Sequence, residues 1–288
     1  MIEATVRAPV EGNVSDLIQL LKEEDTAKVR LDRVALELAR IQTPDLVVEP
    51  FLNQLNALAS QLGDRLRNFN DGRDFVETAQ RYLFQDLGFR GNEEEFYDPR
   101  NSCLNQVIER RTGIPITLSV LYMEIARRLA MPVFGIGLPQ HFVVEFDDGN
   151  YATYIDPFNG GRAITARECF ALAGSRVADP SLLRRVSKKQ IVVRMLQNLH
   201  GAYHRTKDWA RAVETLNFLI VGFSNGVPAA VDLSSAYKRR GLLQIELRHF
   251  QAARGDLEKY LELEPEAHDR EEIQKQIRAI HQWLARVN

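Results

Sequence analysis

The chain contains few of the features that mark secreted, membrane-spanning or nucleic-acid-binding proteins. Only two of its 288 residues are cysteines, too few for a disulfide framework or a cysteine-based zinc site. No apolar run approaches the roughly 20 residues that a membrane-spanning helix needs, and the first residues do not resemble a signal peptide. A net charge of −2 without a basic stripe argues against a nucleic-acid partner. We therefore expect a cytoplasmic protein with both thiols reduced.

The sequence also lacks the patterns of common cofactor and metal sites. No glycine-rich phosphate loop is present, so we expect no nucleotide cofactor. His200 and His204 have the spacing of metal ligands on a helix, but no glutamate between them completes the zinc motif. We expect these histidines to pack inside a helical repeat, and we predict neither a cofactor nor a metal.

Hydrophobic residues, 45% of the chain, divide it into three parts by their spacing. Residues 1–90 show helical periodicity throughout and predict an N-terminal helical layer. Residues 91–187 combine helices with successive strands, an order typical of an α+β core with an antiparallel sheet. Residues 188–288 predict helices only.

The segment HFVVEFDDGNYATYID, residues 141–156, predicts a β-hairpin with its turn at Asp148-Gly149. A two-residue loop would place His141 directly opposite Asp156, with Cβ atoms about 4.5 to 5.5 Å apart. An imidazole and a carboxylate at that distance can share a hydrogen bond, which orients the ring. A structural ion pair is the alternative interpretation. Alternate residues of the first strand should share a face: Phe142, Val144 and Phe146 on one side, His141, Val143 and Glu145 on the other.

Two helices precede this hairpin. Ser102 is a plausible cap for a helix that ends near Gly113. Pro115 suits the first turn of the next helix, which we expect to end at Leu129.

The C-terminal part repeats itself with an offset of 41 residues. The offset superimposes Trp209 on Phe250 and Ala212 on Ala253, and each copy predicts two helices. The pattern resembles the tetratricopeptide repeat, whose period is about 34 residues, and the extra residues fall around 225–228. A terminal capping helix is expected over 269–287.

The segments GIPITLS, residues 113–119, and ARRLAMP, residues 126–132, resemble the core of the transglutaminase-like (papain-like) superfamily. In that superfamily a cysteine begins the helix, and a histidine and an aspartate follow on consecutive strands. His141 and Asp156 match the strand positions, but Pro115 stands where the resemblance places the thiol. Proline has neither a nucleophile nor an N–H for an oxyanion hole.

A closer resemblance is to the bacterial SirB-type group. It rests on the segments DPRNSCLN, RTGIPITLS, GLPQHF and IDPFNGG. This group joins a helical region, a transglutaminase-like core and tetratricopeptide repeats. The resemblance implies that fold and an association with gene regulation.

A substitute nucleophile can be sought among four residues. Cys103 begins the preceding helix, where the dipole could lower the pKa of its thiol, although free cysteines commonly pack as small hydrophobic residues. Ser119 lies one turn deeper than the proline and is expected to pack between helix and sheet. Thr117 points away from the site, and Cys169 has no motif around it.

Two hypotheses follow. The first is a non-catalytic or weakly active binding or regulatory module, a pseudoenzyme that grips a peptide near His141 and Asp156. Its repeats would recruit a protein partner. The second is a cysteine-type hydrolase or acyltransferase, in which Cys103 attacks an amide or ester, His141 is the general base and Asp156 orients it.

Overall fold

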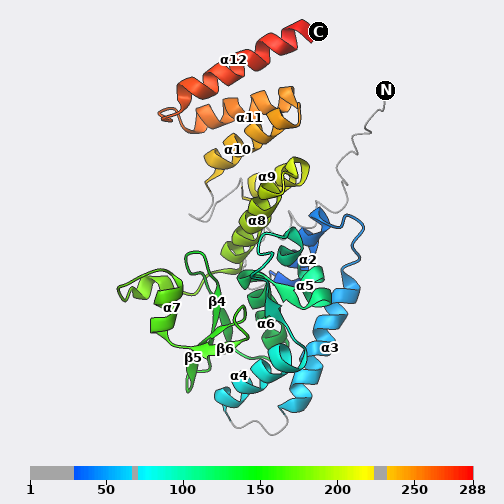
Figure 1. The fold of residues 1–288 in the computed structure, drawn as a ribbon, viewed down its shortest axis with the longest axis vertical. Helices are drawn as coiled ribbons and strands as arrows, with labels where there is room; N and C mark the ends of the chain where they lie inside the picture. Colours follow the sequence, from blue (N-terminus) through cyan, green and yellow to red (C-terminus); the bar gives the residue numbers. More distant parts are fainter. Residues whose placement is uncertain (1–28, 67–70, 224–231, 288) are drawn as a thin grey trace.

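The structure, a computed structural model, describes residues 29–66, 71–223 and 232–287 of the chain (Figure 1). A mixed α+β region forms one end of the molecule, and a stack of helices extends from it to the C-terminus (Figure 1). No helix within the described ranges is both long and apolar enough to cross a membrane.

Helices of the N-terminal region pack around the central helix α6 (Pro115–Arg128), as the predicted helical layer requires. Their apolar stripes, including Leu55 and Leu62, are fully buried in the main core. A π-helical turn extends the last of them and places Tyr82 and Leu83 in the core. The elements are α2 (Leu31–Leu38), η1 (Ala39–Ile41), α3 (Glu49–Arg65), α4 (Gly72–Gln80) and η2 (Arg81–Asp86).

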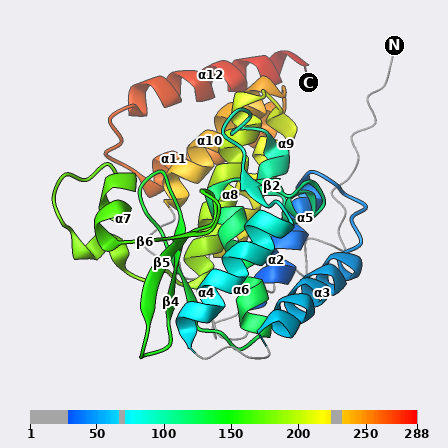
Figure 2. The same cartoon turned by 60° about the horizontal axis from the view of Figure 1, so that its bottom comes forward.

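The central sheet is antiparallel, with strand order β3-β4-β5-β6. Helix α6 covers one of its faces and α7 the other (Figure 2). Phe142, Val144 and Phe146 face the main core, whereas Val143 packs with Cys169 of α7, so the predicted alternation is confirmed. The elements are β3 (Val133–Ile136), β4 (Val143–Asp147), β5 (Ala152–Asp156), β6 (Arg162–Ile164), α7 (Ala166–Leu172) and η4 (Pro180–Leu183).

The predicted hairpin register is wrong by two residues. Asp147 pairs with Ala152 rather than with Asn150, so the loop has four residues instead of two. The Asp148 carboxylate accepts hydrogen bonds from the N–H groups of Asn150 and Tyr151, at 2.8 Å each, and stabilises this longer loop. A shift of two residues keeps every side chain on its predicted face, because the strand period is two.

The helix before α6 also begins and ends differently from the prediction. Residues Pro99–Ser102 form a 3₁₀ turn, η3, and Cys103 is the residue that precedes α5 (Leu104–Arg110). Arg111, with φ of 57°, takes the left-handed position at its end. Gly113 therefore does not end this helix, and instead lies in a short parallel pair, β2 (Thr112–Gly113) with β1 (Arg90–Gly91).

The C-terminal helices confirm the predicted repeat. Trp209 and Phe250, 41 residues apart, each begin a helix, and Ala212 and Ala253 are fully buried where helices cross. The predicted extra residues 225–228 lie outside the described residues. The helices are α8 (Lys188–Arg205), α9 (Trp209–Phe223), α10 (Leu233–Glu246), α11 (Phe250–Leu263) and α12 (Arg270–Val287).

The first and last of these helices have different roles. Helix α8 packs against α2, η3 and α6, and its apolar residues belong to the same core as the N-terminal helices. Helix α12 buries Ile273 and Ile280 against α11, as expected of a capping helix.

Candidate functional site

His141 and Asp156 meet at one end of the sheet. The His141 Nε2 atom lies 3.0 Å from each carboxylate oxygen of Asp156. The side chain of Asp156 is fully buried and that of His141 is 11% exposed. The observed register would place Asp156 opposite Val143, so the imidazole reaches the carboxylate diagonally, which a long side chain can do.

Asn159 completes the hydrogen bonding of Asp156 and was not identified from the sequence. Its Nδ2 donates to Asp156 at 2.7 Å, and the backbone N–H groups of Phe158 and Asn159 donate at 3.1 and 3.3 Å. Burial alone would raise the pKa of Asp156, but the hydrogen bonds from His141 and Asn159 outweigh burial and lower it. The carboxylate is therefore charged at neutral pH.

Arg194 of α8 fixes the backbone of His141. The Arg194 guanidinium donates to the His141 carbonyl at 2.8 Å and lies 5.7 Å from the centre of the Phe142 ring. Burial lowers the pKa of Arg194. Ser119 adds a 3.5 Å contact from its hydroxyl to the Phe142 carbonyl, so this serine packs between helix and sheet as expected.

Only one nitrogen of the His141 ring is used within the described residues. Nε2 bonds Asp156, and Nδ1 makes no hydrogen bond to any residue that the structure describes. When the ring is neutral, the carboxylate keeps the proton on Nε2, so Nδ1 carries a lone pair. The pair can thus present a hydrogen-bond acceptor to a bound group.

Pro115 is the first residue of α6 and is buried. The backbone beside it is fixed by Asn101, whose carbonyl accepts from the Ile114 N–H at 3.3 Å and from the Thr117 hydroxyl at 2.7 Å. The Asn101 side chain in turn donates to the Glu95 carbonyl at 2.7 Å. These structural hydrogen bonds therefore fix the backbone at the start of α6, and the Thr117 hydroxyl makes one of them.

Cys103 lies in the main core with 1% of its surface exposed. Its Sγ atom is 3.5 Å from the Pro99 carbonyl oxygen. Burial, together with the negative charge of Asp98, raises the pKa of the thiol to about 12. This direction is opposite to the activation that a nucleophilic role requires, and the assignment of Cys103 as a nucleophile stays a prediction. Cys169 is fully buried as well, and burial raises its pKa to about 12.

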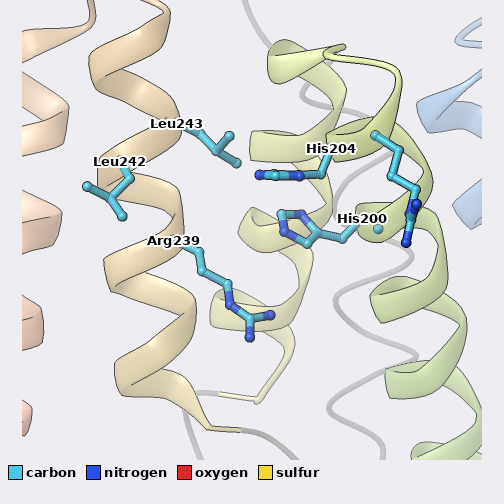
Figure 3. A pocket seen from close by; sticks show the side chains of 7 residues that line it. His200, His204, Arg239, Leu242 and Leu243 are labelled. Carbon is cyan, nitrogen blue, oxygen red and sulfur yellow. The ribbon is translucent and has the colours of Figure 1, made fainter.

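Of the two repeat histidines, His200 is packed as expected, whereas His204 is exposed. Both line a groove between α8 and α10 (Figure 3). His200 is buried, with its Nδ1 atom 3.2 Å from the Ala212 carbonyl oxygen and 3.3 Å from the Thr215 hydroxyl. The ring of His204 stands edge-on to Trp209 at 5.4 Å. Across the described ranges, no group of three or more histidine, cysteine or acidic side chains could hold a metal ion.

Comparison with known proteins agrees with this architecture. Residues 49–197 match the profile of the transglutaminase-like superfamily, and residues 199–278 match a tetratricopeptide repeat profile. Fold and site together define a transglutaminase-like protein that carries tetratricopeptide repeats. A protein of Xylella fastidiosa (strain 9a5c), named UPF0162 protein, is 35% identical over 268 residues, which cover 90% of this chain and 93% of that protein. The chain belongs to the UPF0162 family.

Two further similarities are more distant or more local. Human F-box only protein 21 is 37% identical over 133 residues, which cover 43% of this chain and 21% of that protein. A solved structure of menin, described as revealing the binding site for Mixed Lineage Leukemia protein, has a TM-score of 0.46 and 10% identity. It covers 93% of this chain and 70% of that chain.

Proposed function

We propose that this protein is a non-catalytic binding module for a peptide or protein partner. The observation that carries the proposal is Pro115 at the first position of α6, where the resemblance places the thiol, in a chain that has the His141–Asp156 pair. Burying a charged carboxylate costs free energy. Packing alone therefore does not account for a buried, fully hydrogen-bonded carboxylate that orients a partly exposed imidazole. The pair is well suited to orient one hydrogen bond to a ligand.

The ligand group follows from the tautomer of His141. Its Nδ1 lone pair accepts a hydrogen bond, so the bound group is a donor such as a peptide N–H or a hydroxyl. No covalent step is involved, because proline cannot attack a carbonyl.

A row of ring contacts connects this pair with the first repeat helix. Ring centroids are 5.9 Å apart for His141 and Phe158, 6.0 Å for Phe158 and Phe96, and 5.2 Å for Phe96 and Tyr97. The half-exposed Tyr97 stacks under the guanidinium of Arg205 of α8 at 3.8 Å. One partner can therefore contact both the core and the repeats along a continuous surface.

Thiol labelling tests the catalytic alternative, in which Cys103 is the nucleophile. A raised pKa and burial predict that iodoacetamide at pH 8 modifies Cys103 at least ~100-fold more slowly in the native protein than in urea. The rate, followed by peptide mass mapping to separate the two cysteines, should not change in His141→Ala. Rapid labelling with an acid-shifted pKa that is lost in His141→Ala would favour the enzyme instead.

Peptide display tests the binding module itself. Random peptides on phage, selected on the full-length protein, should yield binders whose affinity falls at least ~10-fold in His141→Ala, the loss of one well-made hydrogen bond in a desolvated site. His281→Ala, at an exposed histidine of α12, is the matched control and should bind normally. Selection that enriches no peptide contradicts the proposal.

A further inference from the structure

Asn159, which holds the carboxylate of the candidate site, is followed by a glycine. The chain contains one other Asn-Gly pair, Asn225-Gly226, which lies outside the described residues. Asn159 is exposed in the turn between β5 and β6, although its amide reaches the buried Asp156. A glycine after an asparagine lets its backbone nitrogen attack the side-chain amide, because no Cβ hinders the approach. The turn therefore combines an accessible amide with a neighbour that can react with it.

Two features of Gly160 favour this attack. Its N–H makes no hydrogen bond to any residue that the structure describes, and a Cβ at this position would meet no heavy atom within 4 Å. Asn150 in the hairpin loop provides the contrast. It is also exposed, but the N–H of the next residue, Tyr151, donates to the Asp148 carboxylate at 2.8 Å. The attacking nitrogen is therefore free after Asn159 and engaged after Asn150.

We propose that Asn159 is a modification site, at which deamidation disconnects the His141–Asp156 pair. The Gly160 nitrogen bonds to Cγ of Asn159 and loses its proton, the Cγ–Nδ2 bond breaks, and ammonia leaves with that proton. Water then opens the succinimide ring at either carbonyl carbon, to which its hydroxyl adds while its hydrogen returns to the nitrogen. The products are aspartate and isoaspartate. The net reaction consumes one water and releases one ammonia, and it requires neither an enzyme nor a redox partner.

Either product places a negative charge where the site has a hydrogen-bond donor. The Nδ2 atom of Asn159 lies 2.7 Å from the Asp156 carboxylate, and a carboxylate oxygen in its place would repel that group. Isoaspartate also lengthens the backbone by one carbon. It thereby disturbs the turn in which the N–H groups of Phe158 and Asn159 donate to Asp156 at 3.1 and 3.3 Å. Deamidation therefore weakens the hold of Asp156 on the His141 ring.

Ageing of the full-length protein at pH 8 and about 37 °C tests the reaction. Peptide mapping by mass spectrometry with fragmentation identifies each converted asparagine by the mass difference between an amide and a carboxyl group. Asn159 should convert at least ~10-fold faster than Asn150, and at least ~10-fold more slowly in Gly160→Ala, because a Cβ hinders the attacking nitrogen. That alanine has φ of 76° but no steric clash. Conversion of Asn159 no faster than that of Asn150 overturns the proposal.

The effect on the His141–Asp156 pair is measured separately, through the nitrogen chemical shifts of the His141 ring. Asn159→Asp introduces the new charge directly, and Asn53→Asp, at an exposed asparagine of α3, adds the same charge elsewhere as the control. The shifts should change in Asn159→Asp and, in proportion to conversion, in the aged wild type, but not in Asn53→Asp.

The remaining outcomes contradict the proposal. Unchanged shifts in Asn159→Asp, or equal changes in Asn159→Asp and Asn53→Asp, would show that the modification does not act on the pair. Neither the mass measurement nor the chemical shifts involve a ligand. The proposal therefore stands or falls independently of the proposed binding function.

Discussion

Two carboxylates, Asp32 of the N-terminal helical layer and Asp156 of the central sheet, are both fully buried, yet their partners differ in kind. Asp32 lies in the first turn of α2. It accepts hydrogen bonds from guanidinium groups, from that of Arg30 at 2.9 and 3.1 Å and from that of Arg128. Asp156 accepts from an imidazole and from the amide of Asn159. Guanidinium groups remain charged at every accessible pH, whereas an imidazole exchanges its proton near neutrality.

The difference separates a structural cluster from the proposed binding site. Arg127 and Arg128 end α6, and Glu124 of the same helix is buried beside them. Asp32 therefore fastens the N-terminal helical layer to the far end of the helix that Pro115 begins. The charged groups of that cluster pair with one another, whereas His141 keeps one ring nitrogen without a hydrogen bond among the described residues.

Asp32→Ala should cause the largest loss of stability. The substitution removes one of the two carboxylates that neutralise the Arg128 guanidinium, the other being that of Glu124, and removing one partner of a buried ion pair costs about 3–5 kcal/mol. The Arg128 side chain, 10% exposed, cannot turn readily to water. Urea unfolding followed by circular dichroism measures the change. Asp45→Ala, at an exposed aspartate, should change the free energy of unfolding by less than ~0.5 kcal/mol. A small change in the free energy of unfolding in Asp32→Ala would show that the ion pairs of this cluster contribute no more to stability than weak surface pairs do.

Asp156→Asn should cost less, about 2 kcal/mol, because it removes charge-assisted hydrogen bonds but keeps the shape of the side chain. The new amide can donate toward His141, which favours the opposite tautomer of the ring. Nitrogen chemical shifts of His141 should report that change, together with weaker peptide binding. Asp45→Asn, at an exposed aspartate, is the control. An unchanged tautomer would show that Asp156 does not orient the imidazole.

Acid titration should show how much of the effect of Asp32 on stability depends on its charge. Burial opposes ionisation of Asp32, but the hydrogen bonds from Arg30 and Arg128 prevail and lower its pKa to about 2. A carboxyl whose pKa is lower in the folded state stabilises the protein above the unfolded value near 4, and this contribution is lost as the pH falls toward the folded value. The stability difference between wild type and Asp32→Ala should therefore shrink between pH 4 and pH 2. A difference independent of pH would assign the effect of Asp32 to packing.

The pairing of His141 with Asp156 could be predicted because it depends on which residues share a face of the sheet. The wrong register shifted the hairpin by two residues and kept both side chains on one face. Asn159 and Arg194 could not be found in this way. Asn159 acts through an irregular turn, and Arg194 lies 53 positions from His141 in a helix whose packing partner the sequence did not define.

The repeat helices were predictable from the spacing of small and aromatic residues, but their groove was not. At equivalent positions the first repeat has His200 and the second has Gly241. A Cβ on Gly241 would lie 2.9 Å from the Leu257 side chain, so glycine there permits close helix packing. His200 instead fills its crossing and bonds across it. Which side chain faces a groove depends on these crossings, and the repeat period does not specify them.

The smallest effect is expected at Ala130, which follows the end of α6 held by Asp32. Ala130 is exposed and has φ of 57°, a conformation that glycine adopts without strain. Ala130→Gly should stabilise the protein by about 0.5 kcal/mol, since relief of left-handed strain slightly exceeds the added entropy of the unfolded chain. Ala279→Gly, in the exposed interior of α12, should destabilise by about 1 kcal/mol. If both substitutions destabilise, the backbone at Ala130 carries no strain, and the end of α6 is fixed by the Asp32 cluster alone.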